Sequence, residues 1–506
     1  MLRVRALRSR VCIVNLNVEF NTNMTVEPPY KAIASQYKAS LDARIPSEWR
    51  LPASLALPQN ASKLVASSGL LDMRELQITA LDATALRDAV AQRVYSAVEV
   101  ATAYAKAAAV VHQATNCLMD YFPEEAMERA KWLDDHMERT GTSLTADHLG
   151  LKGHEITAGF ASWAGNNIPL KDSTIIGILR AAGAVFYVKT TNPQAIMQLE
   201  TDSFLGPTLN PYNRRLTSGG SSGGEGALIG GGGSCMGIGT DIGGSIRNPA
   251  ANCGVFGFKP TSIRLPKYGN RSAVAGQESI VGAIGPMARS ARDLSLFIST
   301  ILASEPWKLD PTNAGMPWRP SEVTWIGGDK PRIGVMWDDG VVKPQPPMRR
   351  ALEVAVSKLR EAGFDTVGYE PYGTAEAWDI ILVRRREAFR VAYAMHFGTA
   401  NVDVILCPPT PGPAPTLGTS RYWSYTSMFN LVDFPGGVFP TGLTVEPSDK
   451  IIERSAFLSK EDEEVWLLYS PEVMVGAPLS LQVLANRWED EKALAALELI
   501  SKVVSS

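Results

Sequence analysis

Residues 217–261, TSGGSSGGEGALIGGGGSCMGIGTDIGGSIRNPAANCGVFGFKPT, decide how this chain is interpreted. The segment holds two neighbouring hydroxyls, Ser221 and Ser222, and a third, Ser245, directly after Ile242-Gly243-Gly244. Glycine at this density is costly in ordinary helices and strands, because it loses more backbone entropy on folding than any other residue. It is typical of a backbone that approaches a ligand closely or points its N–H groups at developing negative charge. The segment therefore predicts an active site.

Three other glycine motifs fit this segment less well. A phosphate-binding loop needs a lysine after its glycines, and the first one here is Lys259. A dinucleotide fingerprint needs a third glycine where the chain has Ile242. Residues 219–223 match the G-x-S-x-G nucleophile elbow, but that elbow follows a strand and uses a downstream histidine. Residues 210–215 indicate a turn instead, and the only later histidine is His396.

Residues 219–261 resemble the defining motif of the amidase signature family, which includes fungal acetamidases and fatty acid amide hydrolase. The resemblance implies that Ser245, in the G-G-S-I-R segment, is the nucleophile. It implies that Ser221 is a second catalytic serine that follows a cis peptide bond. It also implies an oxyanion hole, in which glycines let backbone N–H groups converge. These N–H groups belong to Ile242, Gly243, Gly244 and Ser245.

The same resemblance implies an α/β fold in which helices cover both faces of a mixed, twisted central sheet. Its mechanism is a Ser–cisSer–Lys relay, in which a neutral lysine takes a proton from Ser221 and Ser221 takes one from Ser245. The substrate is a small-molecule carboxylic amide, which is released as carboxylate and ammonia or amine. No metal or organic cofactor is required. Ser222, Asp241 and Arg247 are expected to support the loop through hydrogen bonds.

The chain departs from the family pattern at the general base. The family lysine lies six residues before a Lys-Gly pair, and here the position six before Lys152 is Ala146. The apolar strand before that lysine is also expected to be missing. Lys152 lies about 20 Å away along an extended chain, and Lys171 leads into the next helix, so neither is expected to replace the base. Activity is therefore expected to be weak or absent. An evolved loss of the base and an incomplete gene model or splice form both explain the missing segment.

Three functions are compatible with these features. The first is a fungal-type amidase with impaired activity. The second is a degenerate relative that binds an amide or acyl ligand without turnover. The third is the amidase subunit of a glutamine-dependent transamidation complex, which would retain the lysine and is therefore disfavoured.

The composition excludes several other classes. The 506 residues are 45% hydrophobic and 20% charged, which is typical of a globular protein with a large core. A net charge of −3 gives no basis for nucleic-acid binding. The apolar runs are far shorter than a membrane span. Five widely spaced cysteines indicate free thiols in a reducing compartment, so a cytoplasmic location is expected, and a homodimer is compatible with the sequence.

Residues 1–66 are predicted to form an N-terminal extension and a proline-rich surface arm, with Met24 as the expected start. Residues 67–506 are predicted to form the amidase domain. Ser222 and Glu225 are expected to form a capping box at the start of a short helix. The pattern predicts helices at 81–87, 96–113, 123–139, 173–183 and 348–363, and strands at 184–189, 332–337 and 402–407.

The sequence also indicates what surrounds the site. Met197 is expected either in the acyl pocket or in the core, and residues 408–415 and 422–425 are expected near the mouth of the pocket. Between residues 381 and 384 the chain is shorter than the fungal amidases that it resembles. His136 and His154 are isolated in the sequence, so both are expected to have surface or packing roles.

Overall fold

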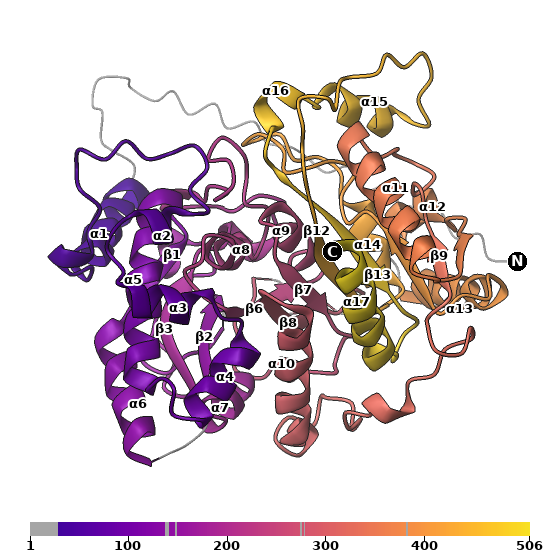
Figure 1. The fold of residues 1–506 in the computed structure, drawn as a ribbon. Coiled ribbons are helices and arrows are strands. Elements are labelled where there is room, and N and C mark those ends of the chain that lie inside the picture. Colours follow the sequence, from indigo (N-terminus) through magenta and orange to yellow (C-terminus); the bar gives the residue numbers. More distant parts are fainter. Residues whose placement is uncertain are drawn as a thin grey trace, which may run out of the picture.

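The computed structural model describes residues 29–136, 141–146, 149–273, 276–277, 279–380 and 383–505, with the backbone alone at 141–146, 378–379 and 383–384. Two sheets lie side by side, and helices surround both of them (Figure 1). The expected extension at residues 1–23 lies outside the described residues.

The larger sheet has eight strands in the order β10-β9-β11-β13-β12-β7-β8-β6. The pairs β10–β9 and β9–β11 are parallel and the other pairs are antiparallel, so the sheet is mixed, as predicted. Its strands are β6 (Met236–Asp241), β7 (Phe256–Lys259), β8 (Ala283–Ala288), β9 (Ile333–Val335), β10 (Thr366–Gly368), β11 (Val404–Cys407), β12 (Gly436–Thr444) and β13 (Pro478–Leu484).

The smaller sheet contains the segment that ends at Ala146, where the family lysine was expected. It consists of β1 (Leu118–Tyr121), β3 (Ala184–Thr190) and β2 (Gly141–Ala146), in the order β1-β3-β2. Strand β2 runs parallel to β3 with Ala146 opposite Thr190, and it lies against β6. The expectation that this strand is missing is therefore wrong. Backbone pairing with β3 supplies its hydrogen bonds, and threonine is well tolerated in strands.

Helices cover both faces of the larger sheet. Successive side chains of a strand point to opposite faces, so neighbouring positions show which helix covers each face. A Cβ on Gly257 of β7 would touch Ala250 of α9 (Arg247–Asn252), whereas one on Gly437 of β12 would touch Leu497 of α17 (Asp490–Ser505). Next to α9 lies α8 (Gly223–Gly230), and next to α17 lie α10 (Ala291–Ala303) and α11 (Pro346–Glu361).

The remaining elements form outer layers and connections. The helices are α1 (Pro29–Ala43), α2 (Leu64–Ser67), α3 (Met73–Ala80), α4 (Ala83–Ala91), α5 (Ala97–Thr115), α6 (Pro123–His136), α7 (Thr174–Ala181), α12 (Thr374–Asp379), α13 (Val383–Thr399), α14 (Ser424–Leu431), α15 (Lys460–Leu467) and α16 (Pro471–Met474). The 3₁₀ turns are Ser47–Trp49, Ala161–Trp163, Gln194–Ile196, Pro306–Lys308 and Pro320–Glu322, and a two-stranded ribbon pairs β4 (Asp202–Ser203) with β5 (Gly206–Pro207).

Local sequence signals placed several elements correctly. Helix α5 begins with the expected capping box, in which Ser96 and Glu99 exchange hydrogen bonds of 3.1 and 2.8 Å. Strand β3 was expected at its observed position. The expected surface arm contains the 15-residue α1, whose residues other than Leu41 are exposed or half-buried. Leu41 of this helix is buried in the main core. The division into an arm and an amidase domain stays a prediction.

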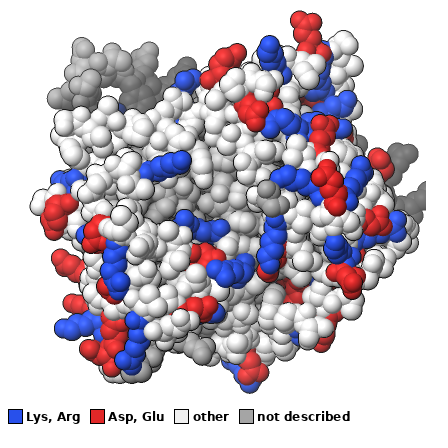
Figure 2. Space-filling view, viewed as in Figure 1, with Lys and Arg blue, Asp and Glu red and all other residues white. Residues whose placement is uncertain are grey.

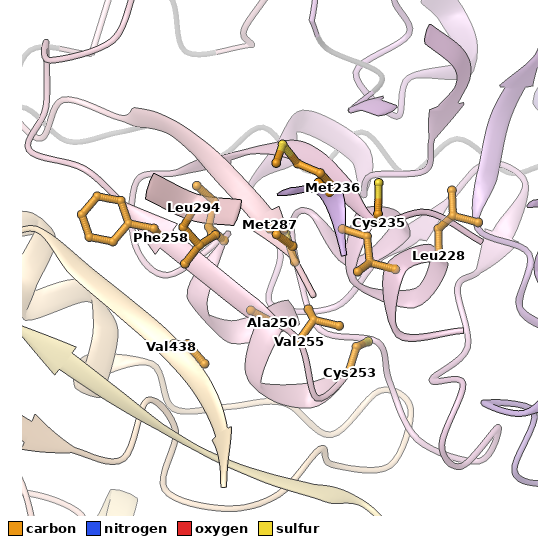
Figure 3. Close-up of a cluster of buried hydrophobic side chains, with 14 of the residues drawn as sticks. Leu228, Cys235, Met236, Ala250, Cys253, Val255, Phe258, Met287, Leu294 and Val438 are labelled. Carbon is orange, nitrogen blue, oxygen red and sulfur yellow. The ribbon is translucent and has the colours of Figure 1, made fainter. Parts of the chain in front are cut away.

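The serine-bearing segment is packed into the main core. Buried apolar side chains of this segment, from α8, β6, α9 and β7, pack against others from β8, α10 and β12. They lie together in Figure 3. Cys235 and Cys253 belong to this cluster, and with Cys117 and Cys407 they are free, buried thiols, as expected. Cys12 lies outside the described residues.

On the face shown in Figure 2, positive and negative side chains are interspersed. None of the described helices combines the length and apolarity that a bilayer span requires. In the part of the chain that the structure describes, no three His, Cys, Asp or Glu side chains are grouped so that they could hold a metal ion.

Candidate active site

A cavity of about 320 Å³ lies at the C-terminal end of β6, and Ser221 and Ser245 both line it. Ser221 is buried and Ser245 is half-buried. Met197 also lines the cavity, one of its two expected positions, and Trp423 lines a smaller adjoining pocket that includes Ser245. Two hydroxyls that are 24 residues apart in the sequence therefore line the same cavity.

Close backbone packing holds Ser221 in place. The Gly220–Ser221 peptide bond is cis, as the resemblance implied. A Cβ on Gly220 would lie 2.4 Å from the carbonyl oxygen of Gln198, so only glycine fits there. The N–H of the next residue, Ser222, donates to the carbonyl oxygen of Ser245 at 3.1 Å. This bond ties the two serine segments together.

The two hydroxyls are not hydrogen bonded to each other. Ser221 Oγ is buried and has no partner among the described residues. Catalytic hydrogen bonds are often long in sites without substrate and shorten when substrate binds. The cavity thus holds a pair of hydroxyls with unused hydrogen-bonding capacity.

A buried ion pair fixes the loop that carries Ser245. Arg247 donates from Nε to Asp241 Oδ2 at 3.0 Å and from Nη2 to Oδ1 at 3.1 Å, and both side chains are fully buried. The carboxylate also accepts the Ile246 N–H at 3.2 Å. Burial by itself raises the pKa of Asp241, but the Arg247 charge more than offsets this effect and brings the pKa to about 2. Asp241 is therefore ionised and anchors the loop.

The expected oxyanion hole needs one correction. The Gly244 N–H donates to Asp241 Oδ1 at 2.8 Å, so this amide already has a partner. Gly244 has φ +125°, and a Cβ there would lie 2.2 Å from Thr426 Oγ1. The N–H groups of Ile242, Gly243 and Ser245 have no partner among the described residues. Three amides therefore remain for a ligand oxygen.

Helix α14, which no sequence pattern had indicated, also supports this loop. Thr426 in α14 donates its hydroxyl to the carbonyl oxygen of Gly243 at 2.8 Å. Asn430, one turn later, donates to Asp241 at 2.9 Å and accepts from Arg247 at 2.6 Å. About 180 residues separate these partners in the chain. No local sequence signal could have joined them.

The expected capping box at Ser222 is wrong. No side chain caps the start of α8, where Ser222 has ψ 40° instead of the extended value that a cap requires. Its hydroxyl accepts the Thr240 N–H of β6 at 3.3 Å instead. Ser222 therefore links α8 to the strand that leads to Ser245.

Glu225, the expected acid of that capping box, is fully buried on α8. Its carboxyl lies near the Thr190 hydroxyl, and neither of its oxygens makes a hydrogen bond to a described residue. Burial raises the pKa of Glu225 well above its ordinary value. The carboxyl is therefore protonated over a range where exposed glutamate is ionised.

We expect Glu225→Gln to change how stability depends on pH. A raised folded-state pKa stabilises the wild type fully below the unfolded pKa of about 4.3, and this stabilisation is lost as the pH rises through the folded pKa. Glutamine imitates the neutral carboxyl and does not titrate. Between the unfolded pKa and the folded pKa, the free energy of urea unfolding should shift in favour of the variant by up to about 1.4 kcal/mol per pH unit. A difference independent of pH would contradict this burial of a neutral acid.

Of the lysines and histidines considered for the base, Lys267 lines the cavity, and Lys152, Lys171 and His396 do not. Lys152 and Lys171 are exposed, as expected for residues that do not replace the base. Lys267 lines the cavity, and its Nζ donates to the carbonyl oxygen of Gly282. His396 bonds the carbonyl oxygen of Glu370 and does not line the cavity, so it cannot serve a nucleophile elbow there. The side chain of Ala146 lies outside the described residues.

His154 is less isolated than its sequence indicated. Its ring nitrogens bond Asp120 and Glu125, both at 2.8 Å. Burial lowers the pKa of His154, but the two carboxylates more than offset this effect, so the pKa is raised. His136 is exposed, and its ring stacks on Trp132. Neither histidine reaches the cavity.

The comparisons with known proteins match amidases and amide hydrolases. The sequence profile of the Amidase family matches residues 99–385 and 381–494. A Schizosaccharomyces pombe protein assigned as an amidase is 39% identical over 94% of this chain and 99% of its own length. An acetamidase of Emericella nidulans is 33% identical over 94% of this chain and 98% of its own length. The solved structure of a fatty acid amide hydrolase has a TM-score of 0.89 and 33% identity, covering 94% of this chain and 95% of the other.

These alignments also bear on the length of the chain. The S. pombe alignment spans 542 positions, which is more than the 506 residues present here, so the relative contains residues that this chain lacks. The two profile matches meet at residues 381–385, where a shorter segment was expected.

Proposed function

The chain belongs to the amidase signature family of amide hydrolases, and from this premise we propose that Ser245 cleaves carboxylic amides through an acyl-enzyme, with Ser221 as proton relay. The observation that carries the proposal is the cavity that both serines line together with Ile242, while Gly243 lines the smaller adjoining pocket that includes Ser245. The fatty acid amide hydrolase neighbour acts on an amide, and the related acetamidase is named for one. Both names support an amide as the substrate.

In the proposed reaction, Ser245 Oγ attacks the amide carbonyl carbon as its proton passes to Ser221. The carbonyl oxygen becomes an oxyanion, and the N–H groups of Ile242, Gly243 and Ser245 stabilise it. The relay then returns a proton to the nitrogen, and ammonia or an amine leaves. Water attacks the Ser245 ester in the same way and releases the carboxylate.

This mechanism also needs a general base that accepts the proton from Ser221. Ala146 occupies the position of the family lysine, and Lys152 and Lys171 are exposed to solvent. Lys267 shares the cavity but does not bond Ser221 Oγ. We therefore propose that the enzyme is impaired, because loss of a positioned base lowers a rate by about 10²–10⁴. The alternative is a protein that binds amides in this cavity without turnover.

Ammonia release from a panel of small primary amides tests the proposal with the full chain. We expect slow turnover that falls to the uncatalysed rate in Ser245→Ala, because the nucleophile is gone. Ser234→Ala is the matched control, since Ser234 is a buried serine of the same segment outside the cavity. Turnover that survives in Ser245→Ala would refute the mechanism. Saturable binding without any ammonia in the wild type would support the alternative.

A further inference from the structure

The cavity that holds the two serines also contains an ammonium group, Lys267. Its side chain is half-buried, and its Nζ makes one hydrogen bond, to the carbonyl oxygen of Gly282 at 3.2 Å. No carboxylate of a described residue lies within the 4.0 Å of an ion pair. A lysine ammonium has three protons to donate. Two of them therefore remain for a ligand.

A second donor lies three residues further on, at Asn270. Its backbone N–H bonds the carbonyl oxygen of Lys267 at 3.3 Å, so one turn holds both residues. Asn270 Oδ1 accepts the Gly150 N–H at 3.2 Å, whereas Nδ2 is buried and has no partner. A buried donor without a partner is costly. Asn270 lines the same cavity with Nδ2 beneath the accessible surface, so a bound ligand could satisfy this group after a small movement of the side chain.

The charges around this cavity do not cancel. Asp241 supplies the only carboxylate among the described lining residues, and Arg247 and Asn430 hold both of its oxygens. Arg271, exposed at the rim, adds a second positive charge. Burial lowers the pKa of Lys267 more than the charges of Asp310 and Asp433 raise it, as expected for an ammonium whose charge is incompletely compensated. The cavity therefore favours an anionic ligand.

We propose that Lys267 and Asn270 form a carboxylate subsite, so that the preferred ligands are amides that carry a carboxylate, such as monoamides of dicarboxylic acids. This subsite rests on the proposed function for the fate of the amide, but binding at it requires no turnover. A cavity of about 320 Å³ suits a ligand of this size. Charge-assisted hydrogen bonds to the carboxylate supply the discrimination.

Matched pairs of ligands test the subsite. Succinamate and succinamide have the same shape and differ in one carboxylate, as do glutaramate and glutaramide. Titration calorimetry with the full-length Ser245→Ala protein avoids turnover. At least one carboxylate should bind on the order of tenfold more tightly than its neutral partner. Lys267→Met should abolish this preference, and Lys267→Arg should retain most of it.

Two further variants separate the subsite from general charge effects. Lys171→Met removes an exposed lysine outside the cavity and should leave the preference intact. Asn270→Asp keeps the acceptor for Gly150 but replaces the donor, and should weaken carboxylate binding. Equal affinities in every pair, or a preference that survives Lys267→Met, would overturn the subsite. Ammonia release from neutral amides tests the proposed function separately, so either idea can fail alone.

Discussion

Replacing Ala146 with lysine is expected to raise kcat/KM for a small amide by about 10²–10⁴, which is the usual contribution of a positioned general base. Position 146 ends β2, opposite Thr190 of β3, and β2 lies against the strand that leads to Ser245. A buried lysine has a lowered pKa and can be neutral near pH 7. The gained activity should therefore fall as the pH drops and the amine becomes protonated. Ammonia release across pH measures both effects.

Two controls test whether the gain comes from the amine and passes through Ser221. Ala146→Met adds a side chain of similar length without an amine and should give no gain. Ser221→Ala in the lysine background should remove most of the gain, because the proposed proton path runs through that hydroxyl. An Ala146→Lys protein that folds normally but remains as slow as the wild type would show that the base belongs elsewhere.

The second large effect is expected for stability, from Arg247→Met. This change leaves the carboxylate of Asp241 fully buried beside Asn430 without its positive partner. Removing one member of a buried ion pair typically costs about 3–5 kcal/mol. Urea unfolding should report a loss of this size. Ser245 should also lose activity, because Asp241 anchors its loop.

An exposed ion pair provides the matched control. Arg292 donates to Asp82 at 2.7 Å, and its side chain is 52% exposed. Arg292→Met should therefore cost no more than about 1 kcal/mol. Adding Asp241→Leu to Arg247→Met should recover part of the loss, because the second change removes the unpaired charge. A loss below 1 kcal/mol for Arg247→Met alone would contradict the anchoring role.

The sequence predicted the local parts of this fold well. The capping box of α5 and strand β3 depend on neighbouring residues, and both were found where expected. The cis peptide bond before Ser221 was also implied correctly, because that segment is nearly unbroken in the resemblance. Helix α1 was missed, although Ile33, Tyr37 and Leu41 form an apolar stripe at four-residue spacing. The prolines on either side of this stripe had indicated an irregular segment instead.

The remaining errors come from contacts that local sequence does not encode. Strand β2 forms because β3 and β6 lie beside it, although its own residues had indicated a lost strand. Thr426 and Asn430 reach the Ser245 loop from another helix. Asp241 takes the Gly244 amide, and this changes the number of donors left for an oxyanion. Glu225 follows the capping-box spacing, but α8 buries it instead.

The central claim is that this cavity presents Ser245 as a nucleophile that lacks only its base. The most direct measurement is the site of covalent labelling by a small fluorophosphonate, located by peptide mass spectrometry in the wild type and in Ala146→Lys. We predict one adduct, on Ser245, which forms slowly in the wild type and much faster in the lysine variant. An adduct on Ser221 or elsewhere, or no adduct in either protein, would contradict the claim.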